Sequence, residues 1–173
     1  MNRSCRPWRD GNALAMRDHA FQIRQAVLQD SDQILACLQA AFAPYKHLYT
    51  AAAFADTVLD SLAVKTRMQR MHMLVATVGN QVIGTVSASL CDEHEGYLRG
   101  MAVLPEYQSS GVAKNLLRAI EQWLQESGCN RATLDTTLPL ARAMKFYEKN
   151  GYERSGRTTD FFGMTLIEYA KDL

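Results

Sequence analysis

The order of strand-like and helix-like runs limits the folds that this chain of 173 residues can adopt. Alternating apolar and polar residues at 21–27 predict a first strand. Three strand-like runs then follow one another at 71–78, 81–90 and 96–104, and Gly79-Asn80 offers a two-residue hairpin turn between the first two. A chain of simple βαβ units would alternate throughout, so this order predicts one mixed α/β sheet packed by helices.

Helical spacing of apolar residues fills the stretches between these strands. We expect a first helix to begin with a capping box of Asp30 and Gln33 and to end at Pro44. A second helix is predicted over 50–68, and its apolar face is Phe54, Val58, Leu59 and Leu62.

The C-terminal part alternates helix and strand before two closing strands. A long helix is predicted from about 111 to 127, with Gly128 as its left-handed end. Its buried stripe is Val112, Leu116, Ile120, Trp123 and Leu124. The later elements are a strand at 131–138, a helix at 140–150, and strands at 151–157 and 164–173.

Composition and charge exclude several classes of protein. Nineteen basic and eighteen acidic residues leave a net charge of +1, which argues against general affinity for nucleic acid or membranes. No apolar stretch reaches the roughly 18 residues that a membrane helix requires. We expect an N-terminal arm over 1–20 and one domain over 21–173.

Cysteines and histidines show no spacing typical of a disulfide framework or a metal site. We therefore expect reduced thiols, no metal and a cytoplasmic location. The cysteines are Cys5, Cys37, Cys91 and Cys129, and the histidines are His19, His47, His72 and His94.

A polar loop joins the strand ending near Val103 to the long helix: "VLPEYQSSGVAKNLL", residues 103–117. The first turn of a helix has backbone N–H groups without intrahelical acceptors, and together with the helix dipole they form an anion site. Gly111 and its small neighbours keep that end open to a ligand. Neither a P-loop nor a dinucleotide fingerprint fits, because Val112-Ala113 follows Gly111 and no second fingerprint glycine is present. An ordinary capped helix start remains the alternative.

The C-terminal half resembles the GNAT superfamily of acyl-CoA-dependent N-acetyltransferases. The resemblance rests on "MAVLPEYQSSGVAKNLL", a V-x-P strand end followed by Q-x-x-G-x-A, and on "LDTTLPLARAMKFYEKNGYE", which contains A-x-x-x-Y-x-x-x-G-Y. It implies a single, mostly antiparallel sheet of about six to seven strands with helices on both faces.

The resemblance also implies a site for acetyl-CoA as co-substrate. Its pyrophosphate would lie on the backbone amides of Gln108, Ser109, Ser110, Gly111, Val112 and Ala113. Its pantetheine arm would lie along Met101, Ala102 and Val103, in a V-shaped gap where that strand parts from 131–138.

Three positions depart from the family pattern. Ser109 and Ala113 stand where glycine is common, and Leu140 stands where many relatives carry a cofactor-contacting asparagine, a contact that Thr137 could supply instead. Basic residues at Arg142, Lys145, Lys149, Lys114 and Arg118 are either neighbours of the phosphates or a solvated helix face.

Two roles in acyl transfer carry over by resemblance. The Val103 N–H would stabilise the oxyanion, and Tyr147 would donate a proton or a hydrogen bond to the leaving thiolate. A plain core role for Tyr147 is the alternative, because it shares a helical stripe with Leu140 and Met144.

The general base stays open between several carboxylates, a histidine and a water molecule. Candidates in the turn before the third central strand are Asp92, Glu93, His94 and Glu95, and Asp135 is a candidate on the strand 131–138. We expect the acceptor site to be lined by the first two helices, by 44–50, and by Asp160, Phe161 and Phe162.

These features lead to a primary hypothesis and two alternatives. The primary one is an enzyme that transfers acetyl from acetyl-CoA to a primary amine of a small molecule or peptide, by direct attack in a ternary complex. The alternatives are a non-catalytic acyl-CoA-binding or sensing module and a scaffold without ligand. Nucleic acid and membranes are not expected partners; the acceptor amine and the choice between monomer and homodimer stay open.

Overall fold

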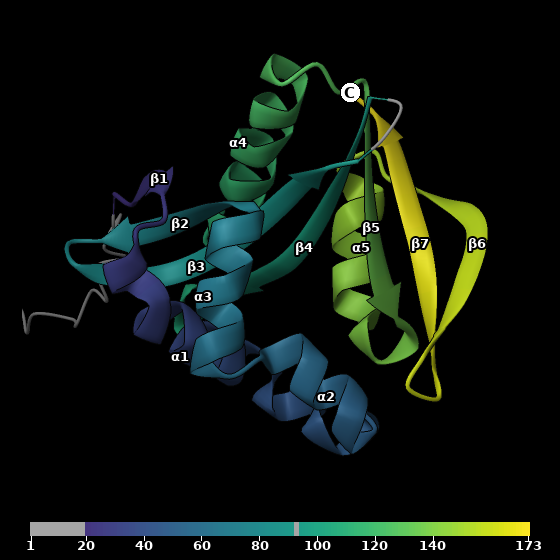
Figure 1. Cartoon of the computed structure of the whole chain (residues 1–173), viewed down its shortest axis with the longest axis horizontal. Helices are drawn as coiled ribbons and strands as arrows, with labels where there is room; N and C mark the ends of the chain where they lie inside the picture. Colours follow the sequence, from purple (N-terminus) through teal and green to yellow (C-terminus); the bar gives the residue numbers. More distant parts are fainter. Residues whose placement is uncertain (1–19, 92–93) are drawn as a thin grey trace, which may run out of the picture.

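One seven-stranded sheet organises the computed structural model, which describes residues 20–91 and 94–173. The strands are β1 (Gln22–Gln25), β2 (His72–Val78), β3 (Gln81–Leu90), β4 (Glu95–Val103), β5 (Arg131–Thr137), β6 (Glu153–Phe161) and β7 (Met164–Asp172). Their order across the sheet is β1-β2-β3-β4-β5-β7-β6, and only the β4–β5 pair is parallel. The predicted mixed, mostly antiparallel sheet is confirmed (Figure 1).

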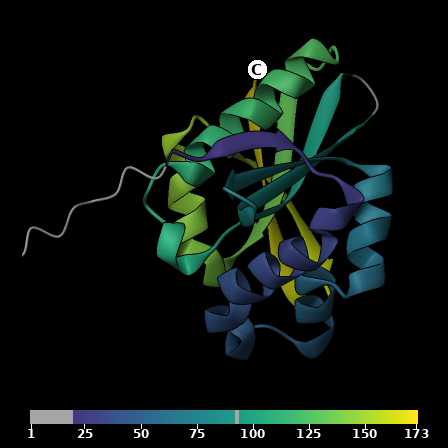
Figure 2. The same cartoon turned by 90° about the vertical axis from the view of Figure 1, so that its left-hand side faces the viewer.

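Helices cover both faces of the sheet. They are α1 (Ser31–Phe42), α2 (Ala51–Val58), α3 (Ser61–Arg70), α4 (Val112–Glu126) and α5 (Ala141–Lys149). One apolar cluster packs α4 and α5 against the sheet, and a second packs α1 and α3 against the opposite face. Figure 2 shows α1–α3 on one side of the strands and α4 on the other. In the described part of the chain, no helix is long and apolar enough to span a membrane.

Helix α4 follows the predicted amphipathic pattern closely. Val112, Leu116, Ile120 and Leu124 are buried as expected, whereas Trp123 is partly buried and stacks on His72 with ring centroids 4.1 Å apart. Gly128 follows the helix with a φ of 90°, so the predicted left-handed end is confirmed.

Two local predictions are wrong. The single helix predicted over 50–68 is two helices, because Leu59 takes a φ of 68° and Asp60 then caps α3 by accepting a hydrogen bond from the Ala63 N–H at 2.7 Å. Leu62, expected on a buried face, is 73% exposed.

The predicted capping box is also absent. The carboxylate of Asp30 instead accepts hydrogen bonds from Arg24 and from the Val27 N–H. The Gln33 side chain bridges to the β2–β3 hairpin, where it bonds the Val82 N–H at 2.9 Å and the Asn80 carbonyl at 3.1 Å. Both side chains therefore join α1 to the sheet, and neither closes the first turn of the helix.

The parallel pair β4–β5 holds only at its start. Pairing runs from Glu95 with Arg131 to Leu98 with Leu134, and no pair follows. The two strands continue to Val103 and Thr137, and Figure 1 shows them diverging. The V-shaped gap expected from the sequence is present.

A bulge in β4 accompanies this divergence. Between two register pairs, β3 advances from Thr85 to Ser87 while β4 covers the longer step from Ala102 to Arg99. Gly100 lies inside the bulge with a φ of 68°, a conformation that glycine adopts without strain. The bulge reverses the side-chain alternation, so Leu98 and Val103 face α4 and α5 whereas Ala102 faces α1 and α3.

Close packing of α4 on β4 yields a stability prediction. Gly96 lies directly beneath Leu124, and a Cβ added at Gly96 would overlap the Leu124 side chain, which is fully buried. We expect Gly96→Ala to lower the free energy of unfolding by about 1–3 kcal/mol through overpacking. Urea denaturation measures this change.

A double-mutant cycle isolates the cause. If the overlap is responsible, Gly96→Ala and Leu124→Ala together should destabilise less than the sum of the two single changes. Strict additivity would show that Gly96 matters for another reason.

Candidate functional site

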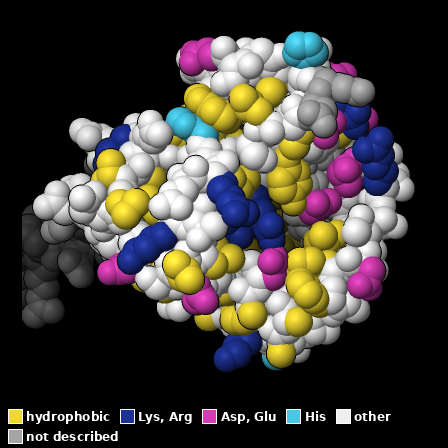
Figure 3. Space-filling view, in the orientation of Figure 1, with side chains coloured by type: hydrophobic (Ala, Val, Ile, Leu, Met, Phe, Trp, Pro, Cys, Tyr) yellow, Lys and Arg dark blue, Asp and Glu magenta, His cyan; other side chains and the backbone are white. Residues whose placement is uncertain are grey.

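A cavity of about 770 Å³ opens where β4 and β5 part. Its walls come from both strands, from the loop before α4, from α5, from the α1–α3 side, and from the β6–β7 hairpin. Figure 3 shows a hollow near the middle of this face, with Lys and Arg side chains at its edge. The cavity therefore connects the two faces of the sheet at the point where the sheet is split.

The loop from 108 to 111 forms one end of the cavity. Ser109 and Gly111 both take left-handed conformations, with φ values of 67° and 89°, and Gly111 precedes the first residue of α4. Ser109 thus keeps the backbone conformation that glycine would adopt there. The N–H groups in the first turn of a helix lack intrahelical acceptors, and at this end of α4 no capping side chain accepts from them.

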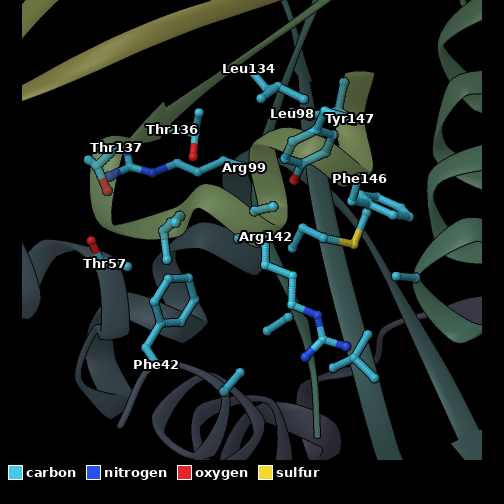
Figure 4. A pocket seen from close by; sticks show the side chains of 18 of the residues that line it. Phe42, Thr57, Leu98, Arg99, Leu134, Thr136, Thr137, Arg142, Phe146 and Tyr147 are labelled. Atoms are coloured by element: carbon cyan, nitrogen blue, oxygen red, sulfur yellow. The ribbon is translucent and has the colours of Figure 1, made fainter. Parts of the chain in front are cut away.

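Arg142 of α5 reaches this loop. Its guanidinium donates to the Gln108 Oε1 at 2.8 Å and to the Ser109 Oγ at 2.9 Å. The Gln108 amide in turn donates to the Val103 carbonyl at 3.2 Å. One chain of hydrogen bonds therefore joins α5, the loop and the end of β4, and places a positive charge beside the loop (Figure 4).

The last residues of β4 direct peptide groups into the gap. The Leu104 N–H donates to the Ile83 carbonyl on β3 at 2.9 Å. Because successive residues in a strand point their peptide groups to opposite edges, the Val103 N–H and carbonyl point toward β5. Pairing with β5 has ended at Leu98, so the Val103 N–H faces the cavity rather than a strand.

Tyr147 of α5 lines the cavity from the α4–α5 side. Its ring packs edge-on against Phe146 and Tyr152, with centroids 5.4 and 5.7 Å away, so the side chain belongs to the core. Its hydroxyl forms no hydrogen bond with another described residue, and it points into the cavity in Figure 4. Burial raises the pKa of Tyr147, so the hydroxyl stays protonated at neutral pH.

Tyr97 and Asp135 lie on the opposite face of the sheet from Tyr147. Leu98 and Leu134 face α4 and α5, so their neighbours Tyr97 and Asp135 face the α1–α3 side. The Tyr97 hydroxyl donates to the Asp135 carboxylate at 3.0 Å. Burial raises the pKa of Asp135, the hydrogen bond from Tyr97 lowers it, and the charge of Glu168 on β7 raises it further.

Aromatic side chains form the outer wall on this side. Phe42, Tyr45, Tyr49 and Phe161 line the cavity, whereas Asp160 and Phe162, also expected there, do not. The Tyr49 hydroxyl bonds the Thr137 hydroxyl at 2.9 Å, which ties the segment after α1 to the end of β5.

The two described residues of the turn before β4 that were candidate bases, His94 and Glu95, do not line the cavity. Asp92 and Glu93 lie outside the described residues. His94 is exposed and bonds the Gly128 carbonyl at 3.0 Å, and Glu95 contacts Arg131 and Thr133. Of the candidate bases that the structure describes, only Asp135 lines the cavity.

The sequence profile of the Acetyltransferase (GNAT) family matches residues 33–152, which include most of α1 and all of β4, the loop, α4, β5 and α5. The chain belongs to the GNAT family.

Curated relatives of this GNAT protein include aminoglycoside N(6')-acetyltransferases type 1. The enzyme from Acinetobacter baumannii is 27% identical over 104 residues, which cover 56% of this chain and 71% of the relative. The enzyme from Stenotrophomonas maltophilia is 32% identical over 71 residues, covering 41% of this chain and 46% of the relative.

Solved structures share the GNAT fold at low sequence identity. PaiA N-acetyltransferase from Thermoplasma acidophilum, in complex with coenzyme A, superposes with a TM-score of 0.74 at 18% identity, over 89% of this chain and 99% of that one. A GNAT-family acetyltransferase from Staphylococcus aureus gives a TM-score of 0.72 at 15% identity, over 89% and 99% of the two chains.

Most residues that the sequence predicted for the GNAT site lie together in the cavity. Those lining it are Met101, Ala102, Val103, Gln108, Ser109, Gly111, Ala113 and Tyr147. Ser110 is exposed and bonds the Tyr107 carbonyl, and Val112 is buried in the core, so their side chains do not line it. Among the basic residues, Arg142, Lys145, Lys149 and Lys114 line the cavity and Arg118 does not.

Sequence reasoning missed Tyr97, Arg67 and Arg99, which also line the cavity. Alternation within β4 could have placed Tyr97 and Arg99 on the face opposite Leu98. Arg67 lies on α3, and the sequence offers no comparable signal that this helix places it in the cavity.

Proposed function

We propose that this protein transfers an acetyl group from acetyl-CoA to a primary amine of a small molecule, by direct attack in a ternary complex. The observation that carries the proposal is one cavity between diverging strands, with a protonated tyrosine on one face of the sheet and a carboxylate on the other. The aminoglycoside acetyltransferases among the relatives support a small-molecule acceptor. Use of acetyl rather than a longer acyl group and a cytoplasmic location are further predictions.

The residues at the loop fit a diphosphate. Backbone N–H groups from Ser109 to Ala113 offer donors at the positive end of α4, whereas the Gln108 N–H already donates to the Pro105 carbonyl at 3.2 Å. Arg142 adds a guanidinium. The free edge of β4 from Met101 to Val103 suits the amide groups of a pantetheine chain, which can bond like an added strand. Acetyl-CoA bound in this way supplies the thioester.

Three groups of this chain then have separate tasks. Asp135 accepts a proton from the attacking amine, directly or through water, because its pKa is raised and it faces the acceptor side. The Val103 N–H is oriented to stabilise negative charge that develops on the thioester oxygen. Tyr147, which stays protonated, donates its proton to the departing sulfur.

Tyr147→Phe tests the proposed acid. Loss of the hydroxyl should lower kcat for thiol release by about 100-fold, because a positioned acid contributes that order of rate, and should leave KM for acetyl-CoA within about threefold. Tyr152→Phe is the matched control: it removes a buried hydroxyl from a neighbouring ring that does not line the cavity, and kcat should stay unchanged. An unchanged kcat in Tyr147→Phe removes this residue from the mechanism.

Arg142→Ala tests the proposed phosphate site. We expect the Kd for CoA, measured by calorimetry, to rise about tenfold through loss of one charge-assisted contact, and the change to shrink at high salt. Arg118→Ala removes an equal charge from a position on α4 outside the cavity and should leave the Kd unchanged. Equal effects of the two variants would mean that only the net charge matters.

Tight CoA binding without turnover on any amine would favour the sensing module.

Tyr97→Phe tests Asp135 through the pH profile. In the wild type, the hydrogen bond from Tyr97 stabilises the ionised carboxylate of Asp135. Its removal should therefore raise the pKa of Asp135. The acid-side midpoint of kcat/KM should therefore move to higher pH, with activity recovering as pH rises. Because the acceptor's own ionisation is the same in both enzymes, the difference isolates Asp135. A profile identical to wild type, or full activity in Asp135→Asn, would assign the base elsewhere.

A further inference from the structure

Arg67 is a buried cation without a partner. Among the described residues, three charged side chains are buried: Asp30, Arg67 and Glu121. Asp30 bonds Arg24 at 2.7 Å, and Glu121 bonds Lys171 at 2.8 Å. Arg67 is only 9% exposed, yet it forms no hydrogen bond or ion pair with any residue in 20–91 or 94–173.

Burial of an unpaired charge is costly, and the surroundings of Arg67 add to that cost. Arg99 lies near enough to repel it, and Arg99 already pairs with Asp56. Burial and the charge of Arg99 lower the pKa of Arg67 to about 10 against the opposing charge of Asp56, so Arg67 remains a cation at neutral pH. Two guanidinium groups therefore face one carboxylate in this cluster.

The Arg67 guanidinium lies close to the β4 bulge. Its Nη1 atom is 2.9 Å from the point where a Cβ at Gly100 would stand. Tyr97 lines the same cavity as Arg67, and its hydroxyl donates to Asp135. Arg67 thus lines the cavity on the α1–α3 side, the side that the proposed base Asp135 also faces.

We propose that the amine acceptor carries a carboxylate, which Arg67 binds: an amino acid, or a similarly small amine with an acidic group near its nitrogen. This inference rests on the proposed function and specifies its substrate class. A guanidinium matches a carboxylate through two parallel hydrogen bonds, and a bound carboxylate supplies the missing counter-charge. The amino group then faces Asp135, and the aromatic wall of Phe42, Tyr45 and Phe161 contacts the remainder of the molecule.

This acceptor differs in charge from an aminoglycoside. A polycation entering the cavity would meet the unpaired guanidinium of Arg67 on the acceptor side, and like charges repel. The chain is therefore expected to discriminate against such substrates, although its curated relatives acetylate them.

The test compares matched acceptors. Thiol release from acetyl-CoA is measured with the twenty proteinogenic L-amino acids, with their α-carboxamides, and with the aminoglycoside kanamycin. We expect kcat/KM for the best free acid to exceed that of its carboxamide by at least about 100-fold. The α-amino group of an amino-acid carboxamide is less basic than that of the free amino acid. At neutral pH a larger fraction of it is therefore unprotonated, so the ionisation of the amine would favour the carboxamide and does not explain a preference for the free acid.

Arg67→Met removes the charge while keeping an apolar side chain of similar length. We expect KM for the free acid to rise about 100-fold, with kcat/KM for the carboxamide and KM for acetyl-CoA within about threefold of wild type. Arg67→Lys should recover part of the loss. Arg70→Met, on an exposed position of the same helix outside the cavity, is the control and should change nothing. A thermal midpoint in Arg67→Met at or above wild type excludes misfolding as the cause.

The outcomes separate this inference from the proposed function. Equal use of acids and carboxamides, preference for kanamycin, no amino acid used or bound, or equal loss on both acceptor types in Arg67→Met would overturn the carboxylate site and leave acetyl transfer standing. If no amine is acetylated, calorimetry with CoA present still decides: an amino acid that binds wild type but not Arg67→Met supports the site. Absence of CoA binding removes the proposed function itself.

Discussion

The parting of β4 from β5 after Leu98 and Leu134 is the constraint on which the rest of the site depends. A continuous sheet would pair with β5 those peptide groups of β4 that point toward it, such as that of Val103, and would separate its two faces completely. Because the strands diverge, those peptide groups face an open cavity, and this cavity connects the two faces of the sheet. The bulge at Gly100 contributes by reversing the side-chain alternation of β4 just where pairing has ended.

This division gives the two sides of the cavity different chemistry. The α4–α5 side presents the helix end, Arg142 and a tyrosine whose buried hydroxyl keeps its proton. The α1–α3 side presents a carboxylate of raised pKa, two arginines and an aromatic wall. Proton donor and proton acceptor therefore lie on opposite sides of the place where a thioester and an amine would meet, which the proposed reaction requires.

The electrostatic character of the acceptor side depends on which charged side chains are buried and paired there, and not on the net charge of the chain. A chain with a net charge of +1 gives no indication of its preferred substrate. Within the cavity, however, Arg99 pairs with Asp56, and Arg67 is buried without an ion pair of its own. Such a group costs stability unless a ligand pairs with it, so a binding role explains Arg67 better than a folding role.

Periodicity, turn residues and short motifs depend on a few neighbouring residues, so the sequence was enough to predict features that are local. These are the order of the strands, the Gly79-Asn80 turn, the apolar stripe of α4, the loop before α4 and the tyrosine on α5. Such local signals failed at Leu59, where a left-handed residue divides two helices, and at Asp30 and Gln33, whose side chains bond distant partners instead of their own helix. The pairing of Tyr97 with Asp135, and the burial of Arg67 against Gly100, join positions more than thirty residues apart. Only tertiary structure decides such contacts, since they depend on which strands pair, where that pairing stops and which helix covers the opened edge.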